Sequence, residues 1–158
     1  MSASMSITIG KHFISATTNV LSTMAHIKPH AGAPYSKTND SAKGDVSAIV
    51  GITGRAKGSI SVSFSKDCAT AVVKGMLGDD IQDLQQDIKD AVGEITNMIS
   101  GQARASLAEA GMVFQGATPT VIMGDGHSIS HVGNGPTVAI PFTTEDGEFT
   151  VEFCIEET

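Results

Sequence analysis

Two segments of the chain alternate strictly between apolar and polar residues, and this alternation constrains the fold more than any other feature. The first is Ile60, Val62 and Phe64 between the serines Ser59 to Ser65, and the second is Phe149, Val151, Phe153 and Ile155 opposite Thr150, Glu152, Cys154 and Glu156. A period of two is typical of a strand with one buried face. Because a β-prone run precedes each segment, at 46–52 and 137–144, the pattern predicts two β-hairpins.

The turns of these hairpins are expected at Thr53–Gly58 and at Asp146-Gly147. The serine face of the first hairpin is expected to point toward solvent or a partner, and the C-terminal strand to be half-buried. Pro141 falls on the opposite face of its strand from the apolar residues. A proline at such a position indicates a sheet edge or a bulge.

Apolar residues recur at helical spacing in three stretches outside the predicted strands. It predicts helices over Ile7–Met24, over Lys66–Leu77 with Gly78 closing it, and over Asp83–Ala110 with Gly111 as its cap. Lys28–Lys43 reads as a loop or an irregular extended stretch, Pro119–Met123 as a strand, and 124–135 as a glycine-rich loop. Together these elements predict an α+β fold in which helices pack on one face of a largely antiparallel sheet.

The chain has 158 residues, which is the size of one domain with a sufficient core, so residues 1–158 are expected to form a single domain. No apolar run reaches the roughly 18 residues that a membrane span requires, and the N-terminus does not look like a secretory signal. A cytoplasmic protein is therefore expected. Two isolated cysteines, Cys68 and Cys154, are then expected to be small buried hydrophobic residues rather than a disulfide.

Charge argues against a nucleic-acid partner. The chain carries 17 acidic and 10 basic residues, a net charge of −7, and every charged residue after Arg104 is acidic. Such a surface repels a phosphate backbone.

The longest predicted helix has two different faces when it is projected at about 100° per residue. The apolar face comprises Leu84, Ile88, Ala91, Val92, Ile95, Met98 and Ile99. The opposite stripe, about 80° wide, comprises Asp90, Glu94, Asn97, Gly101 and Arg104. A polar stripe is normally a solvated face, but Asn97 and Gly101 are poor helix formers that stability alone would not select. Together with Gly93 on the flank, Gly101 leaves room for a partner to approach the backbone.

Other motifs are weaker candidates. The pairs His26/His30 and His127/His131 have metal-like spacing, but Pro29 interrupts the first and a glycine-rich stretch holds the second. The second pair is expected to satisfy loop carbonyls or to cap a strand end. Gly124-Asp-Gly126 and Gly133-Asn-Gly135 lack the ending of a phosphate loop, so nucleotide binding is not expected.

The segment Asp90-Ala-Val-Gly-Glu94-Ile-Thr-Asn97, followed by Pro119, resembles the signature helix of the CheC, CheX and FliY phosphatases of bacterial chemotaxis. The motif occurs once, as is typical of CheX, and Asp67–Leu77 contains no Glu-x-x-Asn. Further CheX-like segments extend the resemblance to nearly the whole chain: Phe13-Ile-Ser-Ala-Thr17, Gly44-Asp-Val-Ser47, Met76-Leu-Gly78, Asn97-Met-Ile-Ser-Gly101, His127-x-Ile-Ser-His131 and Ile140-Pro-Phe142.

The resemblance implies hydrolysis of the aspartyl phosphate on a phosphorylated CheY-like receiver domain. It assigns the catalytic positions to Glu94 and Asn97 and a docking role to Asp90. Gly101 and Arg104, from the same stripe, are expected to be partner-binding residues as well. A carboxamide orients water without competing as a nucleophile, and a glutamate suits the lysine of a receiver site. No cofactor of the chain's own is implied, because Mg²⁺ is expected on the receiver.

Lys89 and Arg104 are the cations nearest to this stripe, and they would have to offset the net repulsion between two acidic proteins. The resemblance also implies a homodimer, formed through an exposed sheet edge. Two alternatives stay open: a non-catalytic module of the same fold that binds a receiver or motor component, and a plain structural or small-ligand domain.

Overall fold

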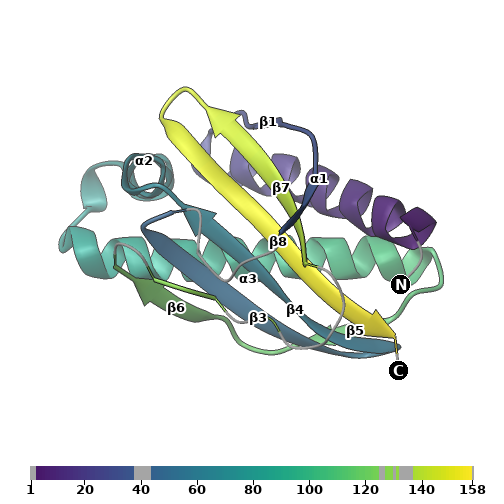
Figure 1. Cartoon of the computed structure of the whole chain (residues 1–158). Coiled ribbons are helices and arrows are strands. Elements are labelled where there is room, and N and C mark those ends of the chain that lie inside the picture. The colour runs from purple at the N-terminus through teal and green to yellow at the C-terminus, as the bar shows by residue number, and fades with distance from the viewer. Residues whose placement is uncertain (1–2, 38–43, 125–126, 130, 132–136, 158) are drawn as a thin grey trace.

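The computed structural model describes residues 3–37, 44–124, 127–129, 131 and 137–157 (Figure 1). Within them, eight strands form one sheet in which all neighbours pair antiparallel, in the order β1-β7-β8-β4-β3-β5, with β2 also on β7 and β6 also on β3. The strands are β1 (His30–Ala31), β2 (Tyr35–Lys37), β3 (Val46–Gly54), β4 (Ala56–Phe64), β5 (Phe114–Gly116), β6 (Thr120–Met123), β7 (Thr137–Thr144) and β8 (Gly147–Glu157).

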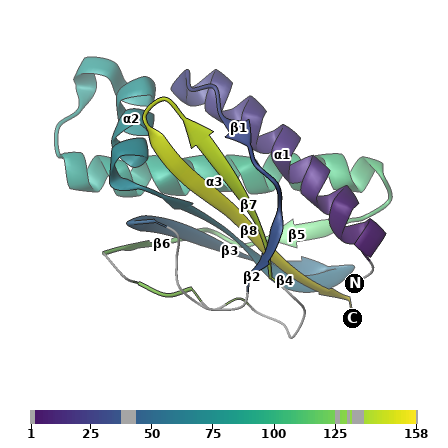
Figure 2. The ribbon, with the colours of Figure 1, turned by 45° about the horizontal axis from the view of Figure 1, so that its top comes forward.

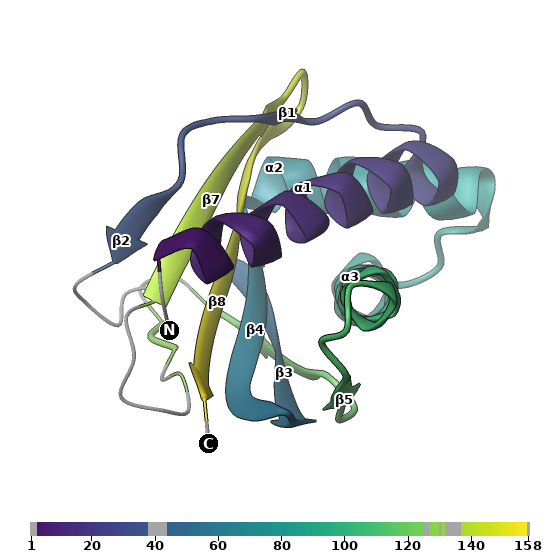
Figure 3. The same cartoon turned by 90° about the vertical axis from the view of Figure 1, so that its right-hand side faces the viewer.

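Three α-helices lie on one face of this sheet, as predicted: α1 (Ala3–Ala25), α2 (Lys66–Leu77) and α3 (Leu84–Glu109), with a short 3₁₀ turn, Gly78–Asp80, after α2 (Figure 3). α1 and α3 run side by side in opposite directions, and α2 lies against the N-terminal end of α3 (Figure 2). The predicted α+β class and the two hairpins are thus confirmed.

The helix ends follow from capping residues. Ser65 accepts a hydrogen bond from the backbone N–H of Cys68 at the start of α2, and Asp83 accepts one from Gln86 at the start of α3. Gly111, just after α3, has φ +88°, which favours glycine. The Asp83 cap fixes the first turn of α3, the helix that carries the candidate stripe.

The core between helices and sheet is aliphatic with a stacked aromatic layer. Phe13 of α1 lies over Phe153, with ring centroids 5.4 Å apart, and Phe149 stacks with both Phe64 and Phe142 at 5.1 and 4.8 Å. The two cysteines are buried, as expected.

The face of the sheet opposite the helices differs from the prediction, because it is buried as well. Ser59, Ser61 and Ser63 are almost completely inaccessible, so the serine face points neither to solvent nor to an open surface. In β8, Glu152 and Cys154 are equally buried, and the strand is therefore buried on both faces rather than half-buried. The physical reason is a second layer over this face, in which the imidazoles of His127 and His131 bond to the serines.

The segment predicted as a loop at Lys28–Lys43 contains two short edge strands, β1 and β2, which both pair with β7. Pro141 lies between the stretches of β7 that they cover, and its carbonyl accepts a hydrogen bond from Gly32. A proline has no N–H to donate, so its place at the interrupted edge agrees with the expectation. Residues 38–43 and most of the glycine-rich stretch 124–135 lie outside the described residues.

The turn of the first hairpin lies where it was predicted, because the pairing of β3 with β4 ends at Ile52↔Gly58. The last residues of β3 pair with β5 instead, and the first residues of β4 pair with β8. Gly54 adopts φ +117°, a conformation that side chains rarely tolerate. β5 was not predicted, because its three residues are too few to carry a periodic signal.

Candidate functional site

The centre of the candidate site is the outward face of α3. Asp90, Glu94 and Asn97 are all exposed there, while the opposite face from Ile88 to Leu107 is buried against α1, α2 and the sheet. Neither Glu94 nor Asn97 forms a hydrogen bond or ion pair with any described residue. The two side chains are one turn apart, so both can reach the same external group.

The two glycines of this helix have different surroundings. A Cβ on Gly93 would lie 3.3 Å from the side chain of Val121 in β6, so close packing against β6 explains this glycine. At Gly101 the nearest atom to a Cβ would be the end of the Arg104 side chain at 3.9 Å, which is ordinary contact distance. Packing among the described residues therefore gives no reason for Gly101, although glycine costs an exposed helix about 1 kcal/mol relative to alanine.

Arg104 faces inward from the stripe. Its Nε donates to Ser100 Oγ at 3.2 Å, and its guanidinium lies so close over Gly116 of β5 that a Cβ there would be 2.7 Å from Cζ. The side chain is half-buried and fastens the C-terminal half of α3 to β5. These contacts give Arg104 a structural role, and they leave it less available to a partner than the projection of an isolated helix indicated.

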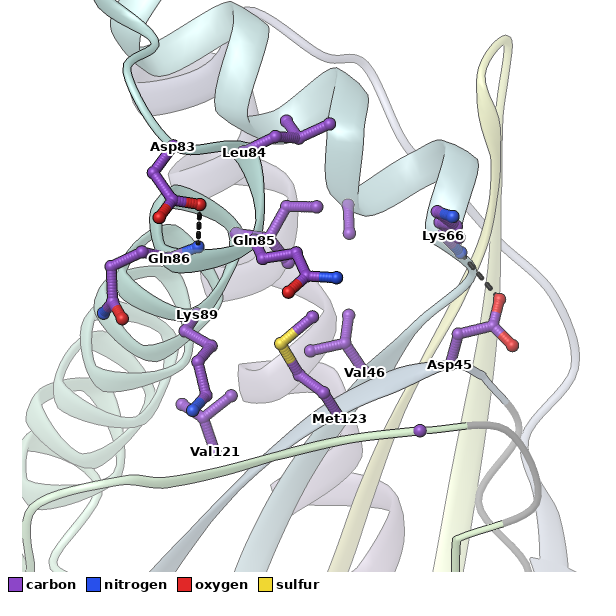
Figure 4. Close-up of a pocket in the computed structure, with 13 residues that line it drawn as sticks. Asp45, Val46, Lys66, Asp83, Leu84, Gln85, Gln86, Lys89, Val121 and Met123 are labelled. Atoms are coloured by element: carbon purple, nitrogen blue, oxygen red, sulfur yellow. Dashed lines mark hydrogen bonds between the residues drawn. The ribbon is translucent and has the colours of Figure 1, made fainter.

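Beside the N-terminal half of the stripe lies a groove of about 770 Å³ between the first turns of α3, the start of α2 and strand β6 (Figure 4). Gln86 joins the groove to the stripe, because it lines the groove and its Nε2 donates to Asp90 Oδ1 at 3.0 Å. Leu84, expected on the core face, instead opens into this groove and is 41% exposed. It is the first residue of α3.

A second polar cluster lies on the far side of the sheet. Lys37 Nζ contacts both carboxylate oxygens of Glu152 at 2.9 and 3.0 Å, and His131 Nε2 contacts Glu152 Oε1 at 3.2 Å. Burial alone would raise the pKa of Glu152, but hydrogen bonds and charge from His131 and Lys37 outweigh it and hold the pKa below 4.5. Because all three side chains are almost fully buried, this cluster is structural and inaccessible to a substrate.

The histidines of the second pair have structural roles, but only His127 bonds a loop carbonyl as expected; His131 bonds side chains of the sheet instead. His127 Nδ1 lies 2.6 Å from the carbonyl of Gly124, and Nε2 lies 2.7 Å from Ser47 Oγ. Nδ1 of His131 contacts Ser59 Oγ at 2.6 Å. In the part of the chain that the structure describes, no three His, Cys, Asp or Glu residues are grouped to hold a metal, and no helix is long and apolar enough to span a membrane.

Comparison with known proteins places this geometry in a family. The family model of the chemotaxis phosphatase CheX matches residues 46–143, which is more than half of the chain and includes all of α3. The chain belongs to the CheX family. The resemblance carried by Asp90–Asn97 is thereby confirmed at the level of the family, with Glu94-x-x-Asn97 inside the matched region.

Individual CheX proteins are similar over most of their length. A CheX of known structure from Desulfovibrio desulfuricans is 72% identical with a TM-score of 0.89, over 94% of this chain and 99% of that one. The CheY-P phosphatase CheX of Thermotoga maritima is 31% identical over 108 residues, which are 68% of this chain and 70% of the relative. A CheX from Borrelia burgdorferi, solved as a complex with CheY, BeF₃ and Mg²⁺, is 27% identical with a TM-score of 0.77, over 93% and 97% of the two chains.

Proposed function

We propose that this chain hydrolyses the aspartyl phosphate of a CheY-like receiver domain, with Asn97 positioning the attacking water and Glu94 pairing with the receiver's lysine. The observation that carries the proposal is the pair itself: both side chains are exposed, one turn apart, and bonded to nothing within the described residues. Membership of a phosphatase family supports it. So does the relative that has been solved together with CheY.

The reaction requires the enzyme mainly to position a water and to stabilise charge. Phosphoryl transfer passes through a loose transition state, so placing a water in line with the breaking P–O bond supplies most of the catalysis. The Asn97 carboxamide has both a donor and an acceptor, which lets it hold a water in one orientation. The metal that phosphoryl transfer uses is expected on the receiver, beside the phosphoaspartate.

α3 suits this task because it is rigid. It packs against both other helices and against β3, β5 and β6, and its buried face runs almost its full length. Side chains on such an element hold their geometry better than side chains on a loop. Asp90, bridged to Gln86, would extend the contact with the receiver on the N-terminal side of Glu94, and Gly101 would leave space on the C-terminal side.

The decisive experiment follows the decay of a phosphorylated receiver with substoichiometric amounts of the chain. Asn97→Ala should slow the accelerated decay by about 100-fold, because it removes only the positioning group. Binding should persist, and thermal stability should hold or rise, since alanine is the better helix former. Glu109→Ala, which truncates an exposed polar side chain at the other end of α3, should leave the rate unchanged. An Asn97→Ala variant that turns over at the original rate would falsify the catalytic assignment.

Glu94→Lys tests the docking role. It sets like charges against the receiver's lysine, so it should weaken binding and hydrolysis together, and more strongly at low ionic strength. Glu109→Lys makes the same change of charge at the exposed C-terminal end of α3 and should have little effect. A wild-type chain that binds the phosphorylated receiver without shortening its lifetime would instead favour a non-catalytic binding module.

We propose in addition that the chain forms a homodimer. The edges of the sheet are β1 and β2 on one side and β5 and β6 on the other, and an unpaired edge is a place where a second copy can add. Sedimentation should return about twice 16.3 kDa. A monomer at micromolar concentration contradicts the proposal.

A further inference from the structure

The carboxylate of Asp90 is held by a side chain of its own helix. Gln86, one turn earlier on α3, donates from Nε2 to Asp90 Oδ1 at 3.0 Å, and both residues are exposed. An ionised carboxylate only accepts hydrogen bonds, so the Gln86 amide has to turn its NH₂ group toward Asp90. In Figure 4 the Gln86 side chain points away from the interior of the groove, into which Gln85 extends. The pair therefore belongs to the outward face of α3.

This bond leaves two acceptors close together. Asp90 Oδ2 and Gln86 Oε1 form no hydrogen bond with another described residue, and Asp90 forms no ion pair with one. Because the amide is neutral, the pair carries the single negative charge of its carboxylate. An ammonium or guanidinium group carries only donors and a positive charge, so it matches two neighbouring acceptors of this kind.

The charges around the pair also favour a cation. Asp87 and Asp83 lie three and seven residues before Asp90, on the same face of the helix. Both accept backbone N–H groups at the start of α3, at 3.0 and 3.3 Å, and keep their charge while they do so. Lys89, the cation of this turn, extends over Val121 on the β6 side in Figure 4. A basic group of a partner is therefore attracted to this part of the outward face.

We propose that Gln86 positions the Asp90 carboxylate to bind a basic side chain of the receiver, separate from the lysine assigned to Glu94. The inference rests on the proposed function. Asp90 and Glu94 are four residues apart, about 6 Å along the helix axis, so the receiver should present two cations at about that spacing. Gln86 acts through Asp90 and is a positioning residue. A carboxylate that is already oriented loses less conformational entropy when it binds.

A double-mutant cycle tests whether Gln86 acts through Asp90. Gln86→Met keeps the length of the side chain but removes its donor, so it should raise the KM for the phosphorylated receiver about threefold and leave kcat unchanged. Asp90→Ala should raise KM about tenfold, and less at high salt. In the Asp90→Ala background, Gln86→Met should have no further effect, because the group that it orients is gone.

Gln85→Met is the matched control. It makes the same change in the neighbouring residue, whose side chain extends into the groove, and should change KM by less than about 1.5-fold. A merely structural role of Gln86 would show in stability instead. The exposed bond to Asp90 adds little to the helix, so Gln86→Met should shift the midpoint of thermal unfolding by no more than about 2 °C.

Gln86→Lys tests the sign of the partner's charge. A lysine can still donate to Asp90, but it cancels the charge of the pair. A cationic partner then loses its attraction, so KM should rise above that of Gln86→Met at low salt, and the excess should disappear at high salt. Gln85→Lys controls for the change in net charge. A KM that Gln86→Lys lowers further than Gln85→Lys does would mean that an acidic group faces the pair, and it would overturn the proposal.

The same variants in an Asn97→Ala background give dissociation constants without turnover. If the wild-type chain accelerates decay but the effects of Gln86→Met and Asp90→Ala multiply independently, or Gln86→Met behaves like Gln85→Met, the positioning role is overturned and the proposed function stands. If no decay is accelerated but the dissociation constants show the coupling, the proposed function fails and the positioning role stands.

Discussion

The buried carboxylate of Glu152 provides a stringent test of the structure. Its side chain has no exposed surface, and that of Lys37 is 2% exposed. Both of its partners come from segments far away in the sequence, since Lys37 is 115 residues and His131 is 21 residues from it. The substitution Glu152→Ala removes the only charge in this cluster that compensates the Lys37 ammonium group, which is too deeply buried to be solvated by water instead.

Breaking a buried ion pair from one side costs about 3–5 kcal/mol, because the remaining charge stays desolvated. Against a total stability of about 5–15 kcal/mol for a typical domain, that is a large fraction. At about 2–4 °C per kcal/mol for a chain of this size, the midpoint of thermal unfolding should fall by roughly 10 °C. Urea unfolding followed by circular dichroism measures the same loss as a shift in midpoint.

Two further variants make the result interpretable. Glu148→Ala removes an exposed glutamate from the same strand and should change stability by less than about 0.5 kcal/mol. The double variant Lys37→Met/Glu152→Leu removes both charges at similar volume and should recover most of the loss. If Glu152→Ala and Glu148→Ala unfold at the same urea concentration, the ion pair is not buried as described; if the double variant is as unstable as the single one, the loss does not come from an unpaired charge.

The same cluster predicts how stability depends on pH. The pKa of Glu152 in the folded chain lies below its ordinary value of 4.5 because hydrogen bonds and charge from His131 and Lys37 outweigh its burial. A carboxylate with a lowered pKa contributes stability that is complete above the ordinary value and is lost as the pH falls through the folded-state pKa. Wild-type stability should therefore drop below pH 4.5 more steeply than that of the double variant.

Two further substitutions and one chemical modification test the surroundings of single residues. Gly101→Ala should raise stability by up to about 1 kcal/mol, since space is available, yet slow receiver dephosphorylation, which a melting curve and the decay assay check together. Arg104→Ala should lower stability by about 1 kcal/mol, through the lost bond to Ser100 and lost packing on Gly116, while the KM for the receiver stays within about twofold. Burial raises the pKa of Cys68 to about 11, so iodoacetamide at pH 8 should leave its thiol unmodified until urea unfolds the chain.

The elements that sequence predicted correctly are those defined by local patterns. The alternation through Phe149 and Ile155 defines a strand whatever it pairs with, and the spacing over Asp83–Ala110 defines a helix within a residue of its observed ends. The predicted exposure of the serine face of β4 and of the polar face of β8 was wrong for a physical reason. Glu152 and the serines are polar, and a polar residue indicates an exposed face unless its partners are known. Those partners are distant in the chain, and no periodicity encodes the contact between Lys37 and Glu152.

The candidate site was likewise predicted only where the local geometry of the helix determines it. Asp90, Glu94 and Asn97 are exposed where the helical projection placed them, because a helix fixes relative directions by its own geometry. The projection places Arg104 in the same stripe but contains no information about β5, whose Gly116 receives the guanidinium. The groove was not predicted either, since it forms between α2, α3 and β6, elements brought together only by the fold.

Three residues of α3 have a low helix propensity, and their contacts differ. An isolated helix with Gly93, Asn97 and Gly101 would lose roughly 2–3 kcal/mol relative to one with alanine at these positions. α3 tolerates them because nine of its residues are buried and tertiary packing provides most of a helix's stability. Of the three, only Gly93 is explained by a contact among the described residues, with Val121. No contact among the described residues accounts for the cost at Asn97 and Gly101, which lie on the face of α3 that carries the exposed Glu94. A partner bound to this face would give that cost a function.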